Sequence, residues 1–148
     1  MVRMTSTTPF DRCHDHQMRA LAGVSLVKSL IETPFEAYDH AAMAAVRREL
    51  AAVLGAYQTL KHEEIFNPAI ASGDAARVGA ACQLKVACIA AGEEFRRYVK
   101  TWADADGHDR WAEYRLSTLT LVKHLRRHIE VERAAIDTLV ASMAAPAH

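Results

Sequence analysis

Apolar side chains recur every three or four residues along this chain, which is the spacing of one face of an α-helix. The pattern breaks and restarts, so it marks separate helices rather than one long one. Its clearest members are Ala20, Val24, Val27 and Ile31 in a first stretch, Val46, Leu50, Val53, Tyr57 and Leu60 in a second, and Leu121, Leu125, Ile129, Ile136 and Leu139 in the last. Between the second and last stretches lies an alanine-rich segment.

Short groups of helix-breaking residues separate these stretches. Thr33 can cap a helix that has Pro34 at its first position, and Asn67-Pro68 predicts that this helix stops there. Two further breaks, at 71–74 and 104–107, contain Gly and Asp. The sequence therefore predicts helices over about 11–31, 34–66, 75–103 and 109–142.

Composition agrees with an all-α class. The chain has 148 residues, of which 51% are hydrophobic but only 7% aromatic, and Gly and Pro are few. This length suits one domain with a core of its own. Because the connections are short, consecutive helices are expected to be antiparallel neighbours. We predict a single domain over 1–148, folded as an antiparallel up-down-up-down four-helix bundle.

Charge and cysteine content limit the expected partners. Eighteen basic residues balance eighteen acidic ones, so no overall positive field favours nucleic acid or an anionic membrane. No stretch approaches the eighteen uninterrupted apolar residues of a membrane span. The three cysteines lack Cys-x-x-Cys spacing, which is not a secreted disulfide framework. We expect a cytoplasmic protein that binds neither nucleic acid nor membrane.

Histidines are frequent, and the expected topology brings several of them to one end of the bundle. The start of helix one, the end of helix two and the later part of helix four meet there. The histidines of these segments are His14, His16, His62, His124 and His128. His40 lies about 33 Å from His62 along the same helix, at 1.5 Å per residue, and cannot share their site.

The pair His128 and Glu132 is the most specific of these signals. The two residues are four apart, and they continue the row of Leu121, Leu125 and Ile136, which points inward. A carboxylate and an imidazole buried among Leu and Ile need each other, a metal or another polar partner. In helix one, His16 shares a row with small and apolar residues and is preferred to His14.

These motifs resemble the hemerythrin-like family, also called the HHE cation-binding family. Asp15-His16 is similar to the family's Asp-His opening of the first helix, and His128-x-x-x-Glu132 matches its fourth-helix motif. Anchoring the second helix on its proline places Gln58 and His62 at the family's His and Glu positions. The resemblance implies a four-helix bundle that carries non-haem iron, usually a di-iron pair, at one end.

Residue by residue, the resemblance leaves four metal ligands, His16, His62, His128 and Glu132. They could hold one Zn²⁺ or Fe²⁺ ion, whereas a full di-iron set is not visible, and a metal-free bundle is equally compatible. We expect a non-enzymatic metal-binding protein that binds or senses O₂ or another diatomic ligand. The alternative is a metal-free regulatory bundle that acts through a protein partner or as a homodimer.

Overall fold

The computed structural model describes residues 8–103 and 109–144, and these residues form helices without any strand. Four helices are long, and shorter helical turns join them. The elements in chain order are α1 (Pro9–Ile31), the 3-10 turn η1 (Phe35–Ala37), α2 (His40–Lys61), the π-helical turn η2 (His62–Phe66), α3 (Asn67–Ala71), α4 (Ala75–Trp102) and α5 (Trp111–Ala144). The predicted all-α class is confirmed.

The first helix begins two residues earlier than the apolar pattern indicated. Thr8 and Asp11 form a capping box, in which each side chain accepts a hydrogen bond from the other residue's backbone N–H, and Pro9 occupies the first turn. The helix then buries Ala20, Val24 and Val27 with other residues of the same face. The capping signal therefore lay before the apolar pattern started.

The second helix starts later than expected and does not stop at Asn67-Pro68. Pro34 precedes only the 3-10 turn η1, and the cap of α2 is Asp39, whose carboxylate accepts from Ala42 N–H. At the other end, helical geometry continues through η2 and α3 to Ala71.

A proline inside a helix lacks an N–H and crowds the carbonyl four residues before it. Here Asn67 N–H donates to the carbonyl of His62, five residues earlier, so the helical turn just before Pro68 contains one residue more than an α-helical turn. Such π turns are frequent at functional sites. This one contains His62, Glu63 and Glu64.

The third and fourth long helices lie close to their predicted bounds. Gly73, whose φ is 71°, makes the turn after α3, and Asp74 caps α4 by accepting from Arg77 N–H. The predicted break at 104–107 and residue 108 lie outside the described residues. Beyond them, α5 runs from Trp111 to Ala144.

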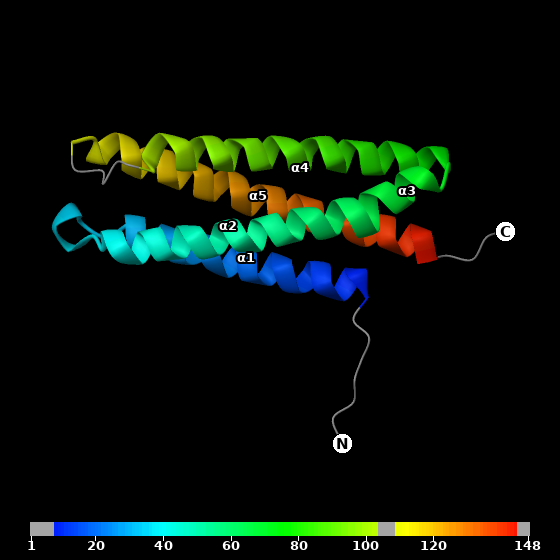
Figure 1. Cartoon of the computed structure of the whole chain (residues 1–148), viewed down its shortest axis with the longest axis horizontal. Coiled ribbons are helices and arrows are strands. Elements are labelled where there is room, and N and C mark those ends of the chain that lie inside the picture. The colour runs from blue at the N-terminus through cyan, green and yellow to red at the C-terminus, as the bar shows by residue number, and fades with distance from the viewer. Residues whose placement is uncertain (1–7, 104–108, 145–148) are drawn as a thin grey trace, which may run out of the picture.

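The four long helices lie side by side and alternate in direction along the long axis of the molecule (Figure 1). At the right of that view, α1 and α4 begin and α2 and α5 approach their ends; at the left, α2 and α5 begin. Helix α1 packs on α2 and α5, and α4 packs on α5. This arrangement is the one that positions the candidate site, because it brings the end of α2 and the later part of α5 together.

The core of the described residues consists of two apolar clusters. The larger contains Tyr38, Tyr98, Trp102 and Tyr114, with Trp111 packed against it. The smaller contains Cys13, Tyr57, Cys88, Ile136 and neighbours. The larger cluster extends from these aromatic residues along the bundle to Leu125 and Ile129, and the smaller cluster lies toward the other end of the long helices.

Helix α4 is unusually apolar for a helix with so little burial. Among the described residues it is the one helix that could cross a membrane by length and composition, with a window of mean hydropathy 1.2 of which 11% is buried. One such helix is weak evidence on its own, because helices of soluble proteins pass the same test. The expected cytoplasmic location stays a prediction.

Candidate functional site

A buried ion pair lies where α2 and α5 approach each other. Lys61 Nζ is 2.7 Å from Glu132 Oε1, and the side chains are 3% and 1% exposed. Burying a charge costs a free energy on the order of several kcal/mol per ion, unless the charge is compensated. Lys61 and Glu132 therefore depend on each other and on the polar groups around them.

Three further side chains complete what we call the polar cluster, defined as Gln17, Tyr57, Lys61, His128 and Glu132. The hydroxyl of Tyr57 donates to Glu132 Oε1 at 2.7 Å and accepts from Gln17 Nε2 at 3.1 Å. The ammonium of Lys61 also lies 3.8 Å from the centre of the Tyr57 ring. Glu132 Oε1 thus accepts hydrogen bonds from two residues of α2, Tyr57 and Lys61. Gln17 of α1 donates in turn to the Tyr57 hydroxyl.

The second carboxylate oxygen of Glu132, Oε2, accepts no hydrogen bond from the described residues. Glu132 Oε2 lies 3.3 Å from His128 Nε2, but neither atom makes a hydrogen bond within the described residues. Burial alone would raise the pKa of Glu132; the neighbouring His128 and the charge of Lys61 outweigh it and hold the pKa below its usual value. Glu132 thus has one oxygen that accepts two hydrogen bonds and one oxygen whose polar neighbour is His128 Nε2.

The four ligands predicted from the sequence share one property. Each has a buried polar atom without a hydrogen-bond partner in the described chain: His16 Nδ1, His62 Nε2, His128 Nε2 and Glu132 Oε2. Buried polar atoms are nearly always paired, so unpaired ones indicate a ligand, an ion or water. That these four residues bind a ligand stays a prediction.

The same four residues do not form a metal-holding group in this geometry. His128 and Glu132 contact each other, but His16 lies beside the Tyr57 ring at 6.2 Å between ring centres, and His62 packs on Phe66 at 5.3 Å. Within 8–103 and 109–144, no three His, Cys, Asp or Glu side chains lie close enough to hold a metal ion.

Lys61 adds a chemical objection to a metal at this point. An ammonium is a donor with no free electron pair, so it occupies one side of the carboxylate as a cation and cannot act as a ligand. The residues present thus do not fit the iron or zinc site that the resemblance implies.

Burial also lowers the basicity of two of the histidines. Loss of water, followed by the charge of Arg19, lowers the pKa of His16 below its ordinary value. For His62 the causes are again loss of water and then the charges of Lys85 and Lys61. Both imidazoles are therefore held in their neutral form.

The remaining histidines lie elsewhere or are already paired. His124, expected near the site, is half exposed, and its Nδ1 lies 2.6 Å from Glu94 Oε2. His40 contacts Tyr38 at the opposite end, with 4.5 Å between ring centres, as the sequence indicated.

Sequence reasoning missed Lys61 as part of the site. A signal was present: Lys61 follows Tyr57 by four residues, so it continues the inward face of the second helix.

The cysteines near the polar cluster are not reactive in this state, since burial raises the pKa of Cys13 to about 12 and also raises that of Cys88.

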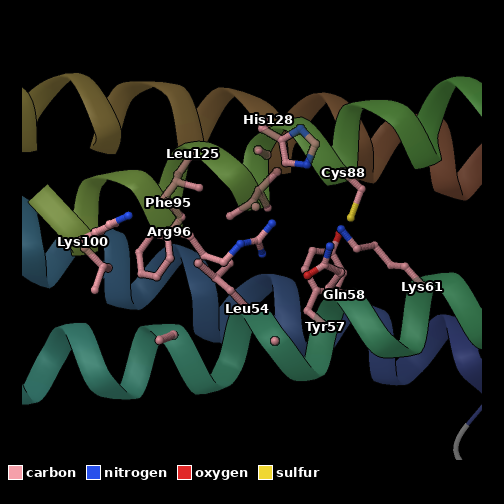
Figure 2. A pocket seen from close by; sticks show the side chains of 16 residues that line it. Leu54, Tyr57, Gln58, Lys61, Cys88, Phe95, Arg96, Lys100, Leu125 and His128 are labelled. Atoms are coloured by element: carbon pink, nitrogen blue, oxygen red, sulfur yellow. The ribbon is translucent and has the colours of Figure 1, made fainter.

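A pocket of about 410 Å³ adjoins the polar cluster (Figure 2). It lies between α2 and α4, with Leu125, His128 and Ile129 of α5 contributing to its wall. Tyr57, Lys61 and His128 belong both to the polar cluster and to the pocket wall. The ion pair and its available groups therefore stand at one side of a space large enough for a small molecule.

Comparison with known proteins adds no identification. No protein-family model, curated protein or solved structure matches the chain significantly. The resemblance to the hemerythrin-like family thus rests on the residues quoted from the sequence.

Proposed function

We propose that this chain is a hemerythrin-like four-helix bundle that works without a metal and binds a small molecule in the pocket between α2 and α4. The observation that carries the proposal is the 2.7 Å contact between Lys61 Nζ and Glu132 Oε1. In a carboxylate-based metal site the carboxylate is neutralised by the metal ion; here a side chain of the protein supplies that positive charge.

Binding is supported by the adjoining unpaired atoms and by the pocket. His128 Nε2 is buried and makes no hydrogen bond in the described chain beyond its 3.3 Å contact with Glu132 Oε2, and His128 lines the pocket wall. Small-molecule sites typically combine an apolar cavity of 300–1,000 Å³ or so with a few polar groups that fix orientation. The pocket beside Lys61 has this character, so it replaces the expected iron site as the proposed centre of function.

Metal analysis of the pure protein tests the first half of the proposal. Protein purified without chelator is expected to contain iron and zinc far below one ion per chain, and to be colourless under air. One iron per chain with an oxygen-dependent absorption band would instead support the metal-binding function expected from the sequence.

A matched variant asks whether Lys61 is what excludes the metal. Lys61→His exchanges the ammonium for a metal ligand beside His128 and Glu132 and is expected to raise zinc binding over wild type. Lys123→His, at an exposed position of α5 outside the pocket wall, serves as the control. Zinc binding by wild type as tight as that of Lys61→His would contradict the role given to Lys61.

A second function is favoured by the surface of α4. Val86 is 68% exposed and Ile89 is 40% exposed, on a helix with a window of mean hydropathy 1.2. This supports the alternative of a metal-free bundle that acts through self-association. Analytical ultracentrifugation of wild type and of a Val86→Glu variant tests it: a dimer that the variant dissociates supports the alternative, and a monomeric wild type removes it.

A further inference from the structure

The wall of the pocket is apolar over most of its area, and small residues give it room. Ala51 and Gly55 of α2 face Ala91 and Gly92 of α4 across it, with Phe95 nearby. Where small residues line both sides of a gap between helices, the helices leave a space that larger side chains would fill. The occupant of this space therefore has an apolar body.

The charged residues of the wall are all basic. They are Lys61, Arg96 and Lys100, and no Asp or Glu lines the pocket. Lys61 is neutralised by Glu132, whereas Arg96 and Lys100 have no ion-pair partner in the described parts of the chain. The pocket thus carries a net positive charge that only its occupant or solvent can balance.

Two nitrogen donors converge at one point of the pocket. A methyl group placed on Gly92 would lie 3.2 Å from Arg96 Nη1 and 3.5 Å from Gln58 Nε2, so both groups lie over Gly92. Figure 2 shows the guanidinium of Arg96 in the middle of the pocket, with His128 and Gln58 to either side. A guanidinium has donors and no acceptor, and its fork matches the two oxygens of a carboxylate.

From this geometry we propose that the pocket binds a monocarboxylate with an apolar body, of the fatty-acid type, whose carboxylate bonds to Arg96 and Gln58. This inference rests on the proposed function, because it names the ligand class of the same pocket. The apolar body lies along the apolar residues of the wall, and Lys100 adds a further positive charge to the same pocket. A polyanion such as a nucleotide does not fit, since most of the wall cannot hydrogen-bond.

Three probes that share one apolar body test the ligand class by calorimetric titration at neutral pH, below the concentrations at which they aggregate. They are decanoate, decanol and decylammonium. We expect decanoate to bind with one molecule per chain, decanol about tenfold more weakly because it lacks a charge-assisted hydrogen bond, and decylammonium not measurably.

Two pairs of variants assign the binding to this pocket. Arg96→Gln is expected to reduce decanoate affinity about tenfold, to that of decanol, whereas Arg97→Gln removes the same charge from the neighbouring position outside this pocket and changes nothing. Gly55→Leu fills the pocket, because nothing lies within 4 Å of a Cβ at Gly55, and is expected to weaken both probes. Gly79→Leu is its control, with equally open space but no place in the pocket wall.

Equal affinities for decanoate and decanol, or equal effects of the two arginine variants, would overturn the carboxylate assignment. Absence of binding by all three probes would overturn it as well. These results leave the metal content untouched, so they are separable from failure of the proposed function. Stoichiometric metal in the pure protein would overturn the metal-free bundle, whatever the probes do.

Discussion

Two regions at opposite ends of the long helices bury polar groups in different ways. At one end lies the aromatic cluster, Tyr38, Tyr98, Trp102, Trp111 and Tyr114; toward the other lies the polar cluster around Glu132. In the aromatic cluster the hydroxyls bond to one another: Tyr38 to Tyr114 at 2.6 Å, and Tyr98 to Thr118 at 2.7 Å. These groups are neutral, and they satisfy each other within the core.

The polar cluster holds charges, and its pairing is incomplete. Lys61 and Glu132 are almost fully buried, yet Glu132 Oε2 and His128 Nε2 make no hydrogen bond among the described residues. Near the aromatic cluster, Nη1 of Arg47 is also buried without a hydrogen bond among the residues that the structure describes. The two regions therefore differ in charge: the paired hydroxyls at the aromatic end are neutral, whereas the polar cluster holds a buried ion pair beside two atoms that make no hydrogen bond in the described chain.

Breaking the ion pair should have the largest effect on stability. Lys61→Met leaves Glu132 buried without its counter-ion and is expected to reduce the free energy of unfolding by about 3–5 kcal/mol. The double variant Lys61→Met/Glu132→Leu removes both charges and should recover most of that loss, because two apolar side chains need no partner. Urea unfolding of the single and double variants measures the difference.

Comparison of the double variant with the two single variants, Lys61→Met and Glu132→Leu, also shows which result would contradict this prediction. If the two charges depend on each other, the double variant is more stable than the sum of the two single losses predicts. Losses that simply add would show that Lys61 and Glu132 are stabilised separately, and the polar cluster would then resemble the aromatic one.

Removing one hydroxyl from each region compares the two directly. Tyr57→Phe removes a donor to the Glu132 carboxylate and should cost about 1.5–3 kcal/mol, as expected for a hydrogen bond to a charged group. Tyr38→Phe removes a bond between two neutral hydroxyls and should cost about 0.5–1.5 kcal/mol. Urea unfolding measures both variants, and equal losses of unfolding free energy would show that the hydrogen bond to the charged carboxylate is no stronger than the one between neutral hydroxyls.

Much of the fold was readable from the sequence because apolar spacing and caps act locally. The rows through Val24 and Leu125 fixed the inward faces of two helices, and both residues are buried. The second helix was misjudged at both ends by reading prolines as boundaries. Pro34 precedes a 3-10 turn, and Pro68 is accommodated by the π turn, whose extra residue depends on contacts that local pattern does not show.

The site was harder to read because it depends on contacts between helices. Glu132 was correctly placed inside the protein, and all four predicted ligands have unpaired buried atoms. That Lys61 of α2 would neutralise Glu132 of α5 could not follow from spacing within either helix. Lysine is almost never fully buried, so the general expectation also argued against it.

The smallest expected effect is the response of the two regions to acid. The pKa values of His16 and His62 lie below the ordinary 6.5, so the folded chain holds fewer protons than the unfolded chain just below pH 6.5. Stability is therefore complete above that pH and falls as the pH drops through the lowered values. Glu132, whose pKa lies below 4.5, adds a second loss only in stronger acid, below pH 4.5.

The double variant His16→Gln/His62→Gln separates these two windows. It should show a flatter dependence of unfolding free energy on pH between 7 and 5, and it should keep the decline that belongs to Glu132 in stronger acid. Urea titrations at half-unit steps of pH measure both slopes. An unchanged slope between pH 7 and 5 would mean that burial does not lower the pKa of either histidine, and would contradict the difference expected between the two ends of the bundle in mild acid.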